Sequence, residues 1–384
     1  MPTDTFVNDD MLTRFRERAP RYDRENIFFQ EDWDELKATG FMTCLVPEDL
    51  GGAGWSVAHY AKELQHIAEY APATALAVNM HQYWVGIAAE MRRLGDPSLE
   101  WLLKEAAAGE IFAAGHAESG NDLPAFLSTA KAERVDGGYK LTGHKMFGSL
   151  TPVWTRYGAH AMTADGQVVH AFMPRDTANY SIKNTWDTLG MRATRSDDTI
   201  LEGAFVPDRY IGRVIPGGQA DLFILCLFAV ALSGIASVYL GIAHRALDLA
   251  CASAKKRTSI AMTRSMAYNA EVQHNIARMA MRIEAMDAQL DRLVADWSGG
   301  AEYGERWPLK IVATKYNVAE GAVDVVDRAM SISGGTGMFK TSELERLYRD
   351  VRCGGFHPAN TLLAPEIVAK ITLGIDLGEQ PRWG

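Results

Sequence analysis

The sequence predicts an α+β protein of three domains, in which two helical regions flank a domain of β-strands. Apolar residues recur every three or four positions in residues 1–110 and again in residues 213–384, which is the spacing of helices with one buried face. Between them, residues 111–212 consist of short β-rich segments separated by turns such as Asp136-Gly137-Gly138. At 384 residues the chain is long enough for two or three domains.

The N-terminal domain is expected to contain five helices. Their predicted ranges are 6–18, 28–39, 57–69, 74–94 and 98–108. Gly40 closes the second of these as a C-cap residue does, and a loop rich in proline and glycine follows at 46–52.

The central domain is expected to contain at least six strands and the C-terminal domain long helices. The strands are predicted at 111–115, 128–135, 139–142, 157–162, 168–174 and 199–206, and the helices at about 221–253, 269–297, 307–331, 341–352 and 364–373. Residues 222–243 are apolar enough for a membrane span, but polar residues such as Ser233 and Tyr239 interrupt them. We therefore expect a buried core helix and no membrane span.

Composition excludes several classes of partner. The formal net charge of −9 argues against nucleic acid or an anionic membrane as the main partner. The four cysteines are scattered with no CxxC, so neither a metal site nor a disulfide framework is indicated. The acidic, polar N-terminus does not resemble a secretory signal. The expected location is the cytoplasm.

The densest group of motifs lies near the C-terminus. Gly334-Gly335-Thr336-Gly337 is a tight turn in which backbone N–H groups can approach a phosphate or a ring. Thr341 or Ser342 is expected to cap a helix that ends in Arg349-Asp350. A glycine break and Phe356-His357-Pro358 follow. A glycine cluster alone also fits a helix-ending turn, so the order of these features is what indicates a site.

This order resembles the C-terminal signature of the acyl-CoA dehydrogenase superfamily of flavoproteins. The resemblance covers essentially the whole chain, because it includes Leu189-Gly190-Met191-Arg192 and the loop at 46–52. It implies an N-terminal helical domain, a central β-barrel or β-sandwich and a C-terminal four-helix bundle. It also implies FAD as cofactor, a small-molecule substrate and a homodimer or homotetramer, with the glycine turn holding part of the FAD of a neighbouring subunit.

Two motifs in the β-domain extend the resemblance to the cofactor. The segment 116–122 resembles a loop that lies against the flavin and the substrate, which implies a flavin contact for Ala117 and a substrate contact for Asn121. The segment 141–149 resembles a strand whose aromatic residue stacks on the flavin, which implies that role for Phe147 and a polar flavin contact for Ser149. The alternatives are turn stabilisation at 116–122 and a core position for Phe147.

A third motif lies at the end of a long helix. Lys255-Lys256-Arg257-Thr258 stands where the family has an arginine that reaches a pyrophosphate across the dimer interface. Lys256 or Arg257 supplies the charge for that role, and we assign it to Arg257. The alternative is a solvated basic helix end.

The sequence departs from the family at the catalytic base. The usual glutamate position falls at about Pro358, and no glutamate lies between Glu345 and Glu366. In other branches of the family the base sits on the helix at 222–243, where the matching position is near Ala231 and is also not acidic. Both standard positions for the base are empty.

His357 and His81 are the remaining candidates for proton transfer. Histidine ordinarily titrates near neutral pH, so either could act as general acid or base. His357 lies beside the empty glutamate position, and Phe356 next to it is expected to contact the substrate. A lone histidine is as often structural.

Three functions remain open at the level of sequence. In the first, a FAD-dependent oxidoreductase desaturates a CoA thioester, a carrier-protein thioester or a related small molecule, with His357 taking the α-proton. In the second, a flavin-dependent monooxygenase of the same fold uses His357 and His81 around a flavin–oxygen adduct. The third is a degenerate flavin-binding or scaffold protein.

Overall fold

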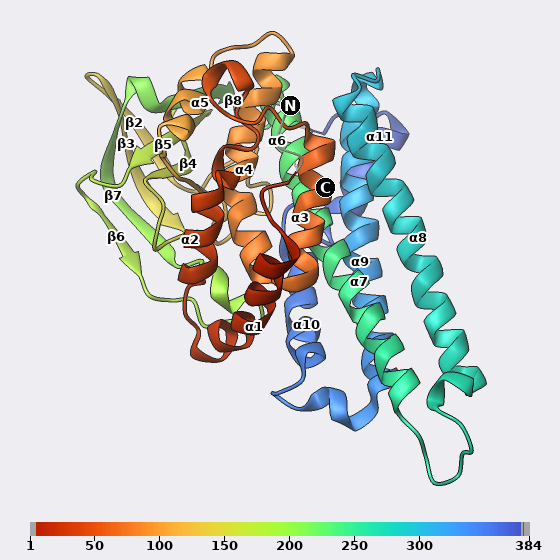
Figure 1. Ribbon diagram of the computed structural model, residues 1–384. Coiled ribbons are helices and arrows are strands. Elements are labelled where there is room, and N and C mark those ends of the chain that lie inside the picture. The colour runs from red at the N-terminus through yellow and green to blue at the C-terminus, as the bar shows by residue number, and fades with distance from the viewer. Residues whose placement is uncertain (1–4, 378, 380–384) are drawn as a thin grey trace.

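The computed structural model describes residues 5–377 and 379, so the outer domain limits at 1 and 384 lie outside the described residues. Figure 1 shows the strands on one side, the long C-terminal helices on the other and the N-terminal helices between them. This arrangement confirms the predicted fold class.

The N-terminal region contains all five predicted helices. They are α1 (Asp9–Glu25), α2 (Gln30–Thr39), α3 (Val57–Tyr70), α4 (Pro72–Arg93) and α5 (Glu100–Ala107). The Asn8 side chain caps α1 by accepting from the Met11 amide, and Gly40 ends α2 in a left-handed conformation with φ 90°. Helix α1 continues past its predicted end because Tyr22, which follows Pro20, is buried in the core.

The central region forms one mixed sheet. Its strands are β1 (Phe112–Gly115), β2 (Lys131–Val135), β3 (Gly138–Lys145), β4 (Arg156–Met162), β5 (Gln167–Pro174), β6 (Tyr180–Lys183), β7 (Asp198–Pro207) and β8 (Ile211–Pro216). The order is β6-β7-β3-β2-β4-β5-β8, with β1 paired in parallel to β4. Strands β6 and β8 are additional to the predicted set, and β8 extends past residue 212.

The C-terminal region is a helical bundle. Its elements are α6 (Leu222–Leu227), α7 (Ser233–Lys256), α8 (Ala270–Ser298), α9 (Trp307–Ser333), α10 (Glu343–Arg352) and α11 (Leu363–Leu373). Helix α9 packs against α7, α8, α10 and α11 and is therefore the centre of the bundle. Short helical turns at Gly334–Met338 and Cys353–Phe356 flank α10.

The apolar helix at 222–256 is buried in the protein. By length and composition it could cross a membrane, but 89% of its most apolar window is buried inside the structure. A single π-helical turn, Phe228–Leu232, interrupts it and contains Ala231. Such π-turns are frequent at functional sites, and this one lies at the second position where the family's base is missing.

Candidate functional site

Two turns of the β-domain carry an unusual concentration of backbone strain. Phe147 and Leu150 have φ of 57° and 66°, and Met191 and Arg195 have φ of 54° and 44°. These are four of the six non-glycine residues with positive φ in the described chain. Residues with side chains rarely adopt this conformation, and where they do it often marks a functional site.

Hydrogen bonds fix the two turns to each other. The Leu150 amide donates to the Thr194 carbonyl at 3.2 Å, and the hydroxyl oxygens of Ser149 and Ser196 are 2.7 Å apart. Ser149 is 7% exposed, so this pair is shielded from water. The turns therefore form one rigid unit around the residues predicted to contact the flavin.

Phe147 lies on the surface and not in the core. Its side chain is 53% exposed and meets Trp186 edge-on, with ring centroids 5.9 Å apart. Nearby in the same unit, Leu189 is 59% exposed. A flat apolar ring held half-exposed in a strained turn fits a surface on which a ring stacks, so the residues present fit a flavin.

Ala117 is brought to the same place. Its carbonyl accepts from the Met146 amide at 2.9 Å, which puts the 116–122 loop beside the Phe147 turn. Asn121, however, uses its side chain within the loop: its amide group donates to Glu118 at 3.0 Å and to the Leu127 carbonyl at 2.7 Å. Asn121 therefore orders the loop, and its geometry does not support the predicted substrate contact.

Glu118 has the stabilising role that was the alternative for this loop. Its carboxylate is buried and pairs with the buried Lys145 ammonium at 2.5 Å. It also accepts from the Ser128 hydroxyl at 2.7 Å and the Thr129 amide at 2.8 Å. The ammonium and these donors hold the pKa of Glu118 below its usual value despite burial.

The Arg349-Asp350 pair joins α10 to the strained turns. Asp350 accepts from the Met191 amide at 2.6 Å, and Arg349 pairs with Asp23 of α1 at 2.6 Å. A Cβ on Gly190 would lie 2.4 Å from the Arg349 carbonyl oxygen, so the close approach requires glycine there. Burial raises the pKa of Asp350 to about 6.

Lys315 of α9 holds the loop that follows α10. Its side chain is buried, and its ammonium donates to the carbonyls of Gly354 at 3.0 Å, His357 at 2.9 Å and Ala359 at 2.9 Å. Burial lowers the pKa of Lys315 to about 8. One charged group thus fixes the whole path of the loop.

Gly354 of this loop allows close packing. A Cβ on Gly354 would lie 3.0 Å from the Tyr239 ring, and neither Gly354 nor Gly355 has a positive φ. The packing brings the loop against the buried helix α7.

His357 is bonded to Tyr239, with the phenol oxygen 2.9 Å from Nε2. Burial and then the neighbouring Lys315 ammonium lower the pKa of His357 to about 3. The imidazole is therefore neutral at physiological pH, and the expectation of an ordinary histidine pKa is wrong here. Its catalytic role stays a prediction. Phe356 beside it is 83% exposed, available to a ligand.

His81 has a structural environment. It is fully buried, its Nε2 donates to the Met42 carbonyl at 2.9 Å and its Nδ1 accepts from the Phe112 amide at 3.1 Å. Burial lowers its pKa to about 4. Both ring nitrogens are used to join α4 to β1 and to the turn after α2, so this geometry argues against the predicted proton transfer.

Arg257 and the glycine turn lie together within one chain. The Arg257 guanidinium donates to the Ile332 carbonyl and is 3.2 Å from where a Cβ of Gly334 would stand. The turn, Gly334-Gly335-Thr336-Gly337, begins with a φ of 61° at Gly334, which favours glycine. Figure 1 shows this end of the bundle far from the strands, so within one chain the turn lies away from the β-domain.

Some residues of the site were not predicted from the sequence. They are Lys315, Tyr239, Ser196 and Asp23. Lys315 left a signal, because it is a lone lysine on the buried face of α9 between Ile311 and Val318. Tyr239 was visible only as a polar interruption of the apolar helix. Among the described residues no group of three or more His, Cys, Asp or Glu side chains could hold a metal ion.

Comparison with known protein families shows which family the chain belongs to. The model of the acyl-CoA dehydrogenase N-terminal domain matches residues 6–101, and that of the acyl-CoA dehydrogenase C-terminal domain matches residues 233–361. The chain belongs to the acyl-CoA dehydrogenase superfamily of flavoproteins and is an oxidoreductase.

Relatives differ in chemistry. The amino sugar nitrososynthase DnmZ of Streptomyces peucetius is 31% identical over 368 residues, covering 92% of this chain and 88% of the relative. A putative acyl-CoA dehydrogenase, YdbM of Bacillus subtilis, is 25% identical over 351 residues, covering 90% of each. The structure of KijD3 with FMN and a dTDP-amino-keto-sugar has a TM-score of 0.83 at 24% identity and covers 95% of this chain and 92% of its own, which shows the shared fold.

Proposed function

We propose that this protein is a flavin-dependent monooxygenase that oxidises the nitrogen of a small amino-bearing molecule, with an amino sugar as the first substrate class to test. The observation that carries the proposal is the absence of a carboxylate base at both family positions, Pro358 and Ala231. Desaturation of an acyl thioester needs a base for the α-proton. A histidine with a pKa of about 3 is too weak to take that role at neutral pH.

The relatives support this direction. DnmZ is named as an amino sugar nitrososynthase and matches nearly the whole chain at 31% identity. Oxidation of an amine by reduced flavin and O₂ needs no base for a carbon-bound proton. A chain with both base positions empty is therefore suited to that chemistry.

The chain's own residues would bind and orient the cofactor. When bound, a reduced flavin supplies the electrons that activate O₂ and pass one oxygen atom to the substrate. Phe147 would cover one face of the ring, and the Ser149 hydroxyl would lie at its edge, restrained by Ser196. The neutral His357 imidazole, bonded to Tyr239, would accept or donate a hydrogen bond at the substrate side.

We propose FAD as the flavin and a homodimer or homotetramer as the assembly. Arg257 offers a positive charge, and the open space at Gly335 lets a phosphate or adenosine approach the backbone. They lie away from the strands within one chain, so a second subunit would have to supply them to a flavin bound at the β-domain. Chromatography of the flavin released by denaturation separates FAD from FMN, and light scattering gives the oligomeric state.

We propose a cytoplasmic location.

Dehydrogenation of an acyl thioester is the second candidate, favoured by the match to the acyl-CoA dehydrogenase domain models. Anaerobic titration of the flavoprotein with acyl-CoA thioesters separates the two. We expect no bleaching of the flavin. We expect O₂-dependent oxidation of an amino sugar nucleotide once the flavin is reduced. Bleaching by a thioester, made stronger by Pro358→Glu, would instead establish the dehydrogenase.

A further inference from the structure

A cavity of about 80 Å³ lies between helix α1 and the beginning of α10. It is lined by Arg16, Pro20, Asp23, Arg24, Lys340, Thr341, Ser342, Glu343 and Arg346. A single water needs only a fraction of this space. The cavity therefore has room for a small polyatomic ligand, and four of its lining residues are basic.

Two arginines that line this cavity have unpartnered donors. The Arg346 side chain is 6% exposed, and its Nε and Nη2 atoms are buried with no hydrogen-bond partner in the described structure. The Nε atom of Arg16 is buried and unpartnered in the same way. Buried N–H groups are nearly always bonded in native proteins, so three such donors at one cavity indicate a missing acceptor.

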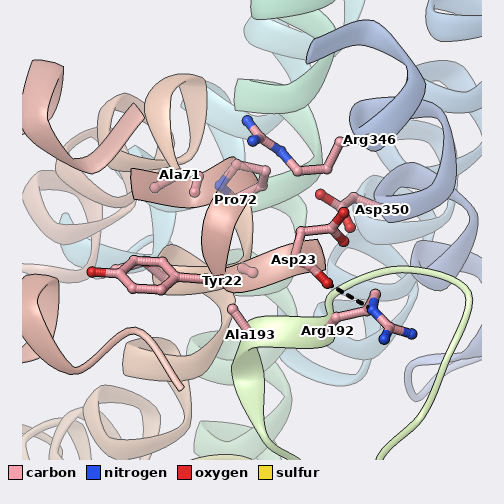
Figure 2. A pocket seen from close by; sticks show the side chains of 11 residues that line it. Tyr22, Asp23, Ala71, Pro72, Arg192, Ala193, Arg346 and Asp350 are labelled. Atoms are coloured by element: carbon pink, nitrogen blue, oxygen red, sulfur yellow. Dashed lines mark hydrogen bonds between the residues drawn. The ribbon is translucent and has the colours of Figure 1, made fainter. Parts of the chain in front are cut away.

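Arg346 also lines a second, smaller hollow next to the cavity. Figure 2 shows its guanidinium extended from α10 toward Ala71 and Pro72 at the start of α4. Arg346 and Asp23 line both spaces. The hollow of Figure 2 has a volume of about 10 Å³, room for one water at most, whereas the α1–α10 cavity has space for a larger acceptor.

The acids at the cavity do not satisfy these arginines. Glu343 pairs with Arg245 at 2.6 Å, and Asp23 pairs with Arg349 at 2.6 Å. Glu343 is 4.0 Å from Arg346 Nη2 and 3.9 Å from Arg16 Nε, too long for hydrogen bonds. Neither acid therefore supplies a hydrogen bond to the unpartnered donors of Arg346 and Arg16.

The N-terminus of α10 adds partial positive charge at the cavity. Ser342 is the N-cap residue, and contrary to the sequence-based expectation its side chain makes no capping bond. The first amides of a helix have no partner within the helix and carry partial positive charge. Together with the two guanidinium groups they match the several acceptor oxygens of a phosphate.

We propose that the α1–α10 cavity binds a phosphate group, held by Arg346 and Arg16 at the N-terminus of α10. The source is either free inorganic phosphate or the terminal phosphate of a small metabolite. The site is separate from the glycine turn and does not depend on the monooxygenase function. Bound phosphate would join α1 to the helix that carries Arg349 and Asp350.

The test uses the holoprotein at saturating flavin, so that the flavin's own phosphates do not confuse the result. The midpoint of thermal unfolding is measured against inorganic phosphate and against a nucleoside 5′-monophosphate, with chloride replacing either at constant ionic strength. We expect the midpoint to rise with phosphate and saturate. Arg346→Gln and Arg16→Gln should each weaken the apparent Kd at least about tenfold, as expected for loss of a charge-assisted hydrogen bond.

Arg14→Gln is the matched control, because Arg14 is on the same helix but exposed and paired with Glu35 outside the cavity. It should leave the Kd unchanged. Tighter binding of the monophosphate than of phosphate would assign the site to a metabolite, and the reverse to the free ion. If Arg346→Gln does not fold, Arg16→Gln decides alone. No phosphate effect on the wild type, or the same Kd in Arg16→Gln, would overturn the proposal.

Discussion

At the scale of single residues, Lys315 has a large effect on one loop. Its ammonium is the shared donor to three carbonyls, and without it those oxygens would be left in a buried environment. Its neighbours on the buried face of α9 include Ile311 and Val318, and an apolar residue in its place would pack but would not donate a hydrogen bond. The loop that carries His357 therefore depends on a residue more than forty positions earlier.

We predict that Lys315→Met lowers the free energy of unfolding by about 2 kcal/mol or more, since each buried group left unpaired costs about 1–3 kcal/mol. Denaturant unfolding measures the loss. The matched control is Lys310→Met on the same helix, where the ammonium lies 3.9 Å over the Tyr303 ring and holds no loop. Equal stability of the two variants would contradict this account.

A second residue-scale prediction concerns His357. If its neutral imidazole hydrogen-bonds the substrate during oxidation, His357→Ala should keep the flavin and the fold while turnover falls by about tenfold, as expected for the loss of one hydrogen bond. His274→Ala, at an exposed position of α8, controls for general effects. Wild-type turnover in His357→Ala would remove this residue from the mechanism.

Lys315 also bears on the protonation of His357. Its positive charge is the second cause, after burial, of the low pKa of that histidine. Removal of a neighbouring positive charge favours the protonated imidazole. In Lys315→Met the pKa of His357 should therefore rise above about 3, which an NMR titration of the ring protons measures.

At the scale of elements, the glycine turn combines two requirements. Gly334 needs glycine for its backbone, because its φ is 61° and Arg257 lies against it. Gly335 has open space where a Cβ would stand, so nothing within the chain requires glycine there. A ligand or a second subunit is the remaining reason for it.

We predict that Gly335→Asp folds normally but loses flavin and assembly, because the carboxylate would face the phosphate. Gly335→Ala should retain both. Absorbance of the bound flavin and light scattering give the readouts. Full flavin retention in Gly335→Asp would refute the assignment of this turn to the cofactor.

The elements show what sequence could predict and what it could not. The ends of long helices such as α8 and α9 were predicted to within two residues. In these helices many apolar residues recur at helical spacing and together define one buried face. Strand β6 was missed because its four residues are partly exposed on both faces and show no alternation. The strain at Phe147 and Leu150 left no local signal, since neither residue type favours a left-handed backbone.

The candidate site was predictable only where function depends on local motifs. Phe147, Ser149 and Ala117 were found by pattern, and the structure brings them together. The roles predicted for His81 and Asn121 stay predictions, although their polar groups hydrogen-bond to backbone groups that the local sequence does not reveal. A sequence shows residue types, whereas satisfaction of their polar groups is a property of the fold.

At the scale of the whole molecule, the three regions meet around Asp350. The Asp350 carboxylate, on α10 of the helical bundle, accepts a hydrogen bond from the Met191 amide of the β-domain. The neighbouring Arg349 forms an ion pair with Asp23 of the N-terminal region. The turn at Met191, which is joined to the turn predicted to contact the flavin, is thus held by both helical regions. Any change in this contact should affect cofactor binding and stability together.

The pH dependence of stability tests that junction. The folded-state pKa of Asp350 is about 6, above the usual 3.8, because burial disfavours the carboxylate. Between pH 4 and 6 the folded protein keeps a proton that the unfolded chain has released. The contribution of Asp350 to the free energy of unfolding therefore falls as pH rises through this window, by about 3 kcal/mol at about 1.4 kcal/mol per pKa unit, and is lowest above pH 6.

Asp350→Asn removes this titration while leaving an oxygen to accept from Met191. The free energy of unfolding of the wild type minus that of Asp350→Asn should therefore fall by about 3 kcal/mol between pH 4 and pH 7, measured by denaturant unfolding at each pH. Asp187→Asn, at an exposed position of the same turn, should show no such trend. A difference that stays constant or rises with pH would mean that Asp350 is ionised without penalty, and that the contact between α10 and the β-domain is looser or wetter than described.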